Sequence, residues 1–207
     1  MDRTNDMIRL CGVIAGRPEL SHVGRDGPYY KFPLAIQRLS GTEDVINILL
    51  EERKLRELEV EILPRLQVTG EVRSFNNRSG EGPRLVITVL ARELQFTEEE
   101  FENTVELIGC LCKEPTLRRT PMGREICDLM LAVNRNYGRS DYLPCITWGA
   151  VARRAAAWPV GTRVRLTGRL QSRAYIKMVG DTPVEKTAFE ISAVSAEEVP
   201  AEEAGNT

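Results

Sequence analysis

The sequence predicts a mostly β protein built from two similar copies, each with one short helix. Two observations support this prediction. Apolar and polar residues alternate with a period of two over much of the chain, as they do in strands with one buried face. Four sequence blocks also recur in the same order at an offset of 97 or 98 residues. A repeat of that length is too long for a solenoid unit, so each copy is a small domain.

The repeated blocks set the expected domain boundaries. The matching pairs are 7–12 with 105–109, 18–20 with 115–117, 34–38 with 131–135, and 68–74 with 166–172. An acidic run follows the first copy, and the chain after the second copy is acidic and has no aromatic residue. We therefore expect a first domain over 1–96, a short acidic linker over 97–102, a second domain over 103–194 and a short acidic disordered tail over 195–207.

The elements are clearest in the second copy, where four strands and one helix can be placed directly. The strands expected by apolar alternation are Val105–Cys112, Glu125–Asn134, Tyr142–Trp148 and Thr187–Val194. The helix is the alanine-rich run Ala150–Trp158, which Pro159 ends. Another strand begins at Arg163 and alternates apolar with polar residues. The first copy repeats this order, with its helix over Glu51–Ile62.

Three strands, a helix and two strands in about 95 residues is the order of an OB-fold, a five-stranded Greek-key barrel. Closing the barrel removes the exposed edges of so short a sheet. Glycines at equivalent mid-strand positions, Gly70 and Gly168, are expected where a coiled strand bends. The predicted fold is therefore a tandem pair of OB-folds, and the alternative is a pair of other small barrels.

Composition excludes several classes of protein. The 207 residues carry a formal charge of -2, and no apolar run approaches the roughly 18 residues of a membrane helix, so a cytoplasmic protein is expected. The five cysteines form no CxxC pair, and the lone His22 has no second nitrogen ligand nearby, which disfavours a zinc site. The thiols are expected to be buried as small hydrophobes. Because no P-loop or acidic metal cluster is present, we expect no cofactor, no metal and no enzymatic activity.

The two copies differ in charge. Residues 103–194 contain 14 basic and 8 acidic residues, a balance of +6, whereas residues 5–96 contain 13 of each. The solvent-facing positions of the fourth strand in the second copy carry a stripe of arginines at even spacing: Arg163, Arg165, Arg169 and Arg173. In the first copy Glu71 replaces Arg169. The second copy is therefore the expected site for an anionic ligand.

Aromatic residues accompany this basic stripe. Tyr142 and Trp148 are six residues apart, an even number, so they share one face of a regular strand. Aromatic faces beside cations are what sequence-independent binding of single-stranded nucleic acid requires. Trp158, at the end of the predicted helix, is instead expected to plug the barrel.

Five segments of the second copy resemble the successive motifs of bacterial single-stranded DNA-binding proteins. They are 103–109, 114–118, 131–135, 142–149 and 168–175, and they run in the family's order. The first copy resembles the same family more faintly, through Gly12 and the segments 17–20, 34–36 and 68–70.

The resemblance implies roles for individual residues. Base stacking is implied for Tyr137, Tyr142, Trp148 and Tyr175. Phosphate contacts are expected from Arg118, Arg135, Arg163, Arg165, Arg169, Arg173 and Lys177, with a minor contribution from Arg73 and Phe75. In the first copy Val45, Glu51 and Asn77 stand where the second has Tyr142, Trp148 and Tyr175, so much of its stacking platform is expected to be lost.

The resemblance also implies a partner and an assembly. The expected partner is single-stranded DNA during replication, recombination or repair, in the bacterial cytoplasm at the nucleoid. Family members present four OB-folds, which a two-domain chain would achieve as a homodimer. The family's apolar C-terminal tip is missing from the end Ala204–Thr207, which disfavours recruitment of replication or repair proteins by that route. The alternative function is a primosome-type or other protein-interaction OB module that binds nucleic acid weakly.

Overall fold

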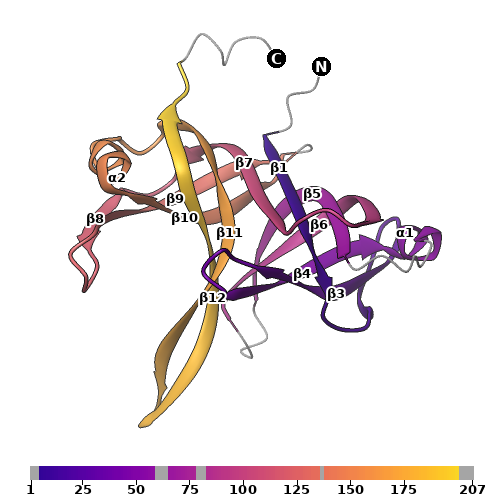
Figure 1. Cartoon of the computed structure of the whole chain (residues 1–207). Coiled ribbons are helices and arrows are strands. Elements are labelled where there is room, and N and C mark those ends of the chain that lie inside the picture. Colours follow the sequence, from indigo (N-terminus) through magenta and orange to yellow (C-terminus); the bar gives the residue numbers. More distant parts are fainter. Residues whose placement is uncertain (1–4, 59–64, 78–82, 136–137, 201–207) are drawn as a thin grey trace. The chain divides into compact units, whose positions relative to one another are not determined.

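The computed structural model of the chain describes residues 5–58, 65–77, 83–135 and 138–200, which form strands and two short helices (Figure 1). These residues group into two compact units. The N-terminal unit contains 7–73 and 87–104, and the C-terminal unit contains the described residues of 1–6, 74–86 and 105–207. The predicted class, mostly β with one short helix in each copy, is confirmed.

The described residues of the first copy form six strands and one helix. They are β1 (Asp6–Ile14), β2 (Glu19–Gly24), β3 (Gly27–Gln37), β4 (Glu43–Glu51), α1 (Glu52–Glu57), β5 (Arg65–Asn76) and β6 (Leu85–Thr97). The strands are paired in the order β2-β3-β4-β6-β5-β1, and a further pairing joins β1 to β3. Because β1 pairs with both β5 and β3, five of the strands close on themselves and β2 extends the sheet outside the ring.

The second copy repeats this arrangement. Its elements are β7 (Glu102–Leu111), β8 (Thr116–Arg119), β9 (Glu125–Asn134), β10 (Ser140–Trp148), α2 (Gly149–Ala155), β11 (Arg163–Val179) and β12 (Thr182–Glu198). The order is β7-β11-β12-β10-β9-β8, and β7 also pairs with β9 to close the ring. The helix α2 packs two alanines, Ala152 and Ala155, into the core.

The interiors of both rings are filled by the alternate apolar residues that predicted the strands. In β5 the buried side chains include Leu66, Val68 and Val72, and in β11 the matching positions Val164, Leu166 and Leu170 are buried. Solvent-facing residues stand between them, as a period of two requires. Trp158 is also buried, which confirms its predicted place in the core.

The expected order of three strands, a helix and two strands omits one strand in each copy. All four residues of β8 are exposed, and in β2 all but Gly24 are exposed. A strand that buries no side chain has no apolar alternation, so the sequence pattern cannot mark it. Both short strands are nevertheless hydrogen-bonded to the next strand of the copy, β2 to β3 and β8 to β9.

The hairpin of β11 and β12 is longer than predicted. Its two strands are paired from Val164 with Glu198 to Val179 with Thr182, and Figure 1 shows this hairpin (orange to yellow) projecting beyond the other strands of the C-terminal unit. The predicted disordered tail therefore begins too early, since 195–198 belong to β12 and Ala196 is buried. Glu197 and Glu198, two of the acidic residues behind that prediction, are exposed residues of this strand end, and 201–207 lie outside the described residues.

The glycines Gly70 and Gly168 permit a close approach of two backbones. A Cβ atom at Gly168 would lie 2.4 Å from the carbonyl oxygen of Ser192, and one at Gly70 would lie 2.2 Å from that of Leu90. The register of β11 and β12 shifts by one residue between Thr167 and Gly168, which is a β-bulge. The bulge and the close approach set the position of Ser192, which lies at the candidate site.

Candidate nucleic-acid interface

Three neighbouring strands of the C-terminal unit bring a cation and an aromatic ring into one row. Arg118 of β8 lies opposite Ile126 of β9, and Ile126 lies opposite Trp148 of β10. Residues directly opposite each other in an antiparallel ladder project from the same face of the sheet. Two of the predicted site residues, Arg118 and Trp148, therefore share a face and are separated by one strand.

A fourth and fifth strand extend this row to the basic stripe. The half-buried Trp148 donates a hydrogen bond from its indole Nε1 to Ser192 Oγ on β12, at 3.1 Å. Ser192 is the direct antiparallel partner of Arg169 on β11. Arg169 is exposed, and within the described part of the chain its guanidinium forms no hydrogen bond or ion pair. The Trp148 indole and the Arg169 guanidinium thus lie on either side of the Ser192 hydroxyl.

Tyr142 occupies the same strand and the same outward side as Trp148. Its side chain is 50% exposed, whereas Leu143, Cys145 and Thr147 point inward and are buried. The predicted common face of Tyr142 and Trp148 is therefore confirmed. Six residues of extended strand separate the two rings by about 20 Å.

A buried ion pair anchors the start of this strand. Arg135 binds Asp141 through two hydrogen bonds, Nε to Oδ2 at 2.6 Å and Nη2 to Oδ1 at 2.5 Å, and the Asp141 carboxylate is fully buried. Ser74 donates its backbone N–H to the same carboxylate at 2.5 Å, and its hydroxyl accepts the backbone N–H of Tyr142 at 2.8 Å. Arg135 was predicted to contact phosphate; this geometry also gives it a structural role in positioning Tyr142.

The arginine stripe alternates as predicted, but its members have different neighbours. Arg163 and Arg165 lie where β11 pairs with β7, opposite Cys110 and Ile108, and Arg165 forms an ion pair with Glu197 at 3.3 Å. Arg173 lies ten residues beyond Arg163, about 33 Å along an extended strand. Of the four arginines, Arg169 is the one that lies opposite Ser192, which accepts the hydrogen bond from Trp148.

Glu190 is a site residue that the sequence pattern did not single out. It lies opposite Gln171, whose Nε2 donates to Glu190 Oε1 at 3.2 Å, and it forms an ion pair with Arg173 at 3.5 Å. Its side chain is mostly buried and projects from the same side of β12 as Ser192, two residues away. A carboxylate therefore lies inside the basic face, where it neutralises part of the charge of Arg173.

Arg118 also has an acidic partner. Its guanidinium binds the carboxylate of Asp128 through two hydrogen bonds, and these bonds raise the pKa of Arg118 further above its usual value. Both side chains are nearly half exposed, so this pair contributes little to stability and can open toward a phosphate.

The remaining residues that were predicted to contact DNA lie in the hairpin of β11 and β12 or outside the described residues. Tyr175 is half-buried on β11, opposite Lys186 of β12. Tyr137 lies outside the described residues, and so does the side chain of Lys177, although the backbone of Lys177 pairs with Val184. The roles of all three stay predictions.

In the N-terminal unit the position matching Arg169 is a carboxylate that holds two arginines. Glu71 forms ion pairs with Arg73 and with Arg92, the second at 2.9 Å. Arg73, predicted to contribute weakly to phosphate binding, is thereby partly neutralised. Phe75, the other minor candidate, lies in the C-terminal unit and is exposed.

The N-terminal unit also contains an aromatic pair that the sequence did not assign. His22 of β2 lies opposite Tyr29 of β3, and the two rings stack in parallel, with centroids 5.0 Å apart and planes 4° apart. Tyr29 in turn lies opposite Glu51 of β4. Burial, and then the negative charges of Glu51 and Asp26, raise the pKa of the Tyr29 hydroxyl. The cross-strand register, which no periodicity reveals, creates this pair.

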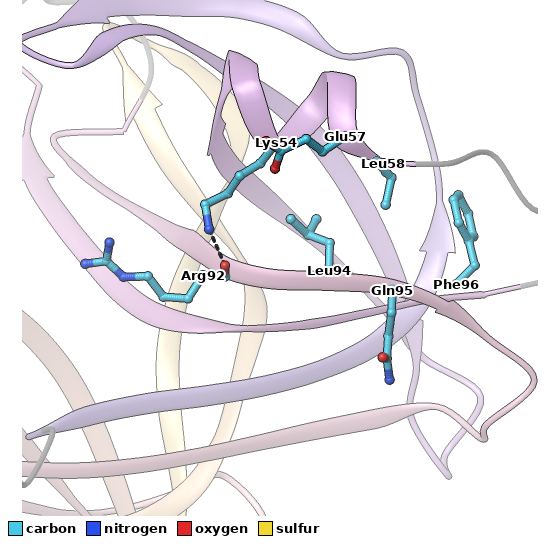
Figure 2. A pocket seen from close by; sticks show the side chains of 7 residues that line it. All are labelled: Lys54, Glu57, Leu58, Arg92, Leu94, Gln95 and Phe96. Carbon is cyan, nitrogen blue, oxygen red and sulfur yellow. Dashed lines mark hydrogen bonds between the residues drawn. The ribbon is translucent and has the colours of Figure 1, made fainter. Parts of the chain in front are cut away.

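A surface hollow of about 340 Å³ lies between α1 and β6 of the N-terminal unit (Figure 2). Figure 2 shows Lys54 reaching across it to donate a hydrogen bond to the backbone carbonyl of Arg92. Glu57 and the apolar side chains of Leu58, Leu94 and Phe96 also line it, together with Gln95. None of the predicted site residues lies there, and its mixed charges do not match the expected interface.

The cysteines have mixed environments. Cys11, Cys127 and Cys145 are buried as predicted, and burial raises the pKa of each thiol. Cys112 is half-buried, and Cys110 is exposed, which contradicts the expectation that all five are buried. Cys110 is exposed because it projects from the outward side of β7, opposite Arg163. Among the residues that the structure describes, no group of three or more potential metal ligands occurs, and no helix is long and apolar enough to cross a membrane.

Comparison with known proteins finds one matching family and several similar proteins. Residues 102–198 match the Single-strand binding protein family. The chain is 34% identical over 85 residues to single-stranded DNA-binding protein 3 of Streptococcus agalactiae, a match that covers 38% of this chain and 62% of that protein. It is 36% identical over 80 residues to single-stranded DNA-binding protein B of Bacillus subtilis, covering 35% of this chain and 71% of that protein.

A solved structure resembles nearly the whole chain. The single-stranded DNA binding protein from Thermus aquaticus superposes with a TM-score of 0.73 over 94% of this chain and 93% of its own, at 21% sequence identity. At that identity the likeness establishes the fold. Together with the family match over 102–198, the relative that is 36% identical and covered to 71% of its length shows that the chain belongs to the single-strand binding protein family.

Proposed function

We propose that the chain binds single-stranded DNA without reading its sequence, through the face of the second copy that carries Tyr142, Trp148 and Arg169. The observation that supports this proposal most directly is the placement of Trp148 and Arg169 on either side of Ser192. A base stacked on the indole would lie beside a guanidinium that has no partner among the described residues. Stacking on an aromatic side chain contributes about 1 to 3 kcal/mol per base and tolerates any sequence.

The extended row adds further contacts. Tyr142 offers a second ring farther along β10, and Arg118 offers a cation on the other side of Trp148. Both Arg118 and Arg173 exchange an acidic partner for a phosphate when DNA binds, so their net contribution is smaller than that of Arg169. The bound strand would follow β10, with Arg169 and Tyr175 supporting it from β11.

The proposal includes the fold and the assembly. Each copy is an OB-fold, because five strands close into a ring and a short helix separates the third and fourth of them along the chain. The chain acts as a homodimer that presents four such folds and protects transient single strands in replication, recombination or repair, in the cytoplasm at the nucleoid. Light scattering at physiological salt tests the assembly: a strict monomer contradicts it.

The binding proposal is tested by titrating the full chain with oligo-dT while its tryptophan fluorescence is recorded. We expect quenching of Trp148, while the buried Trp158 contributes an unquenched background. The logarithm of the binding constant should fall with the logarithm of salt concentration, with a slope near -0.7 for each phosphate contacted. The variant Trp148→Phe keeps a stacking ring and identifies the quenched residue. Absence of binding at low salt contradicts the proposal.

A second candidate function is a protein-interaction OB module. The observation in its favour is the neutralisation of Arg73 and Arg92 by Glu71, which leaves the first copy without the basic character of the second. Under this function both copies serve as assembly surfaces and DNA contact is weak. Retained oligo-dT binding that weakens steeply with salt excludes it as the main function.

A further inference from the structure

The two copies carry corresponding rows across the same three strands. In the second copy the row is Arg118, Ile126 and Trp148, and in the first it is His22, Tyr29 and Glu51. Tyr29 precedes Ile126 by 97 residues and Glu51 precedes Trp148 by 97, which is the offset of the repeat. Both rows therefore contain an aromatic ring. In the second copy it is Trp148 on the third strand of the row, and in the first copy it is Tyr29 on the second strand.

The stacked rings of His22 and Tyr29 offer a planar surface on which a nucleobase can stack. His22 covers one face of the Tyr29 ring at a centroid distance of 5.0 Å, so the orientation of the phenol is set before any ligand arrives. Tyr29 is half-buried, while His22 is exposed. Offset parallel rings at such a separation are favourable, and a planar base added to the pair would extend the stack.

Glu51, the third residue of the row, favours a ligand that can donate a hydrogen bond. Glu51 projects from the same face as Tyr29, and Asp26 is close enough to raise the pKa of Tyr29. Carboxylate oxygens accept hydrogen bonds but cannot donate them. Cytosine, adenine and guanine each carry an exocyclic amino group that can donate a hydrogen bond to a carboxylate, whereas thymine has carbonyl groups and no exocyclic amine.

We propose that His22, Tyr29 and Glu51 form a second nucleobase-binding site, located in the first copy, that takes an amino-bearing base (cytosine, adenine or guanine) of single-stranded DNA in preference to thymine. This inference rests on the proposed function, because DNA must first be held by the second copy. It adds a contact with a base preference to a chain whose second copy binds any sequence. Glu71 already binds Arg73 and Arg92, so these two arginines add little phosphate contact to the site.

The first experiment isolates the site with a double variant of the full chain, Tyr142→Ala with Trp148→Ala, which removes stacking by the second copy. Residual binding of fluorescein-labelled oligo-dC and oligo-dT is measured by anisotropy. We expect oligo-dC to bind about fivefold to tenfold more tightly than oligo-dT, as a hydrogen bond to a charged group allows. Adding Tyr29→Ala should abolish this preference and Tyr29→Phe should retain it. Equal affinity for the two oligonucleotides overturns the proposal.

The carboxylate has its own test and a matched control. Glu51→Gln should equalise binding of oligo-dC and oligo-dT, because an amide can also donate a hydrogen bond to thymine. Glu43→Gln changes an exposed carboxylate at the other end of the same strand and should leave the preference intact. A preference that survives Glu51→Gln overturns the assignment of Glu51.

The second experiment uses the unaltered chain, so it does not depend on how a variant folds. An oligonucleotide containing 5-iodocytosine is irradiated in complex with the protein, and the crosslinked peptides are identified by mass spectrometry. We expect crosslinks at His22 or Tyr29 in addition to those at Tyr142 or Trp148. Crosslinks confined to the second copy overturn this inference and leave the proposed function standing. If the unaltered chain binds no DNA at low salt, both fail.

Discussion

The two copies place different side chains at the same positions of the same strands. Where the second copy has Trp148 beside an uncommitted Arg169, the first has Glu51, and Glu71 holds two arginines. The buried alternation of β5 and β11, the closed ring and the close glycine contact are common to both. The comparison teaches that the core and the ligand face vary independently, because successive residues of a strand project to opposite sides.

The largest expected effect concerns a feature that both copies share. Arg38 binds Asp44 with the same two hydrogen bonds, at 2.6 and 2.5 Å, that join Arg135 to Asp141, and both carboxylates are buried. Replacing either arginine by alanine removes the cation that neutralises a buried carboxylate and should lower the free energy of unfolding by about 3 to 5 kcal/mol.

Thermal unfolding followed by circular dichroism measures this loss for Arg38→Ala and Arg135→Ala. Arg139→Ala changes an exposed arginine four residues after Arg135; it serves as the control and should change stability little. If only one of the two pairs proves important, the copies differ in their framework as well as in their ligand face.

The next largest effect is on oligo-dT binding, and it compares the aromatic position of the second copy with the matching position of the first. Trp148→Ala should weaken oligo-dT binding by the contribution of one stacked base, about 1 to 3 kcal/mol. Glu51→Ala, at the matching position of the first copy, should leave oligo-dT affinity unchanged. Anisotropy titrations at one fixed salt concentration compare the two variants. Comparable losses for both would show that the copies bind DNA equally.

A reciprocal exchange tests the charge difference. Arg169→Glu should weaken oligo-dT binding about tenfold at low salt and make the salt slope shallower by about 0.7, the value for one phosphate contact. Glu71→Arg should strengthen binding, because it releases Arg73 and Arg92 and adds a cation. A loss of affinity in Glu71→Arg would contradict the view that this carboxylate suppresses DNA binding by the first copy.

The smallest effect concerns the carboxylate inside the basic face. Glu190→Gln frees Arg173 from an ion pair with a half-exposed partner, so we expect oligo-dT to bind about two- to threefold more tightly. The salt slope should become steeper, since one more cation faces phosphate. Glu185→Gln, on the outer part of the same strand, is the control. Unchanged affinity would show that Glu190 serves the fold alone.

Much of the architecture could be predicted because it depends on local patterns. Alternation along 163–171 correctly separates buried from solvent-facing residues, and the repeat of 97 residues correctly makes the two copies alike in element order. The exposed strands β2 and β8 and the outer hairpin of β11 and β12 bury few side chains. Their pairing is therefore invisible to a hydrophobic pattern.

The candidate site could be predicted only in part. Placing Tyr142 and Trp148 on one face follows from their even spacing, and the structure confirms it. The hydrogen bond from Trp148 to Ser192, and the ion pair of Glu190 with Arg173, join residues 44 and 17 positions apart. Such contacts depend on which strands become neighbours, and a single sequence does not record that.

By itself the sequence determined the β class, the duplication, the residues that face inward and the unequal charge of the two copies. The tertiary structure decided which cation meets which ring. Periodicity assigns a side chain to one of two faces, but its neighbours across the sheet are set by hairpin register, the β-bulge at Gly168 and the parallel pairing of β10 with β12. For that reason Arg169, alone of the four arginines in the stripe, lies opposite the partner of Trp148, and Tyr29 lies against His22.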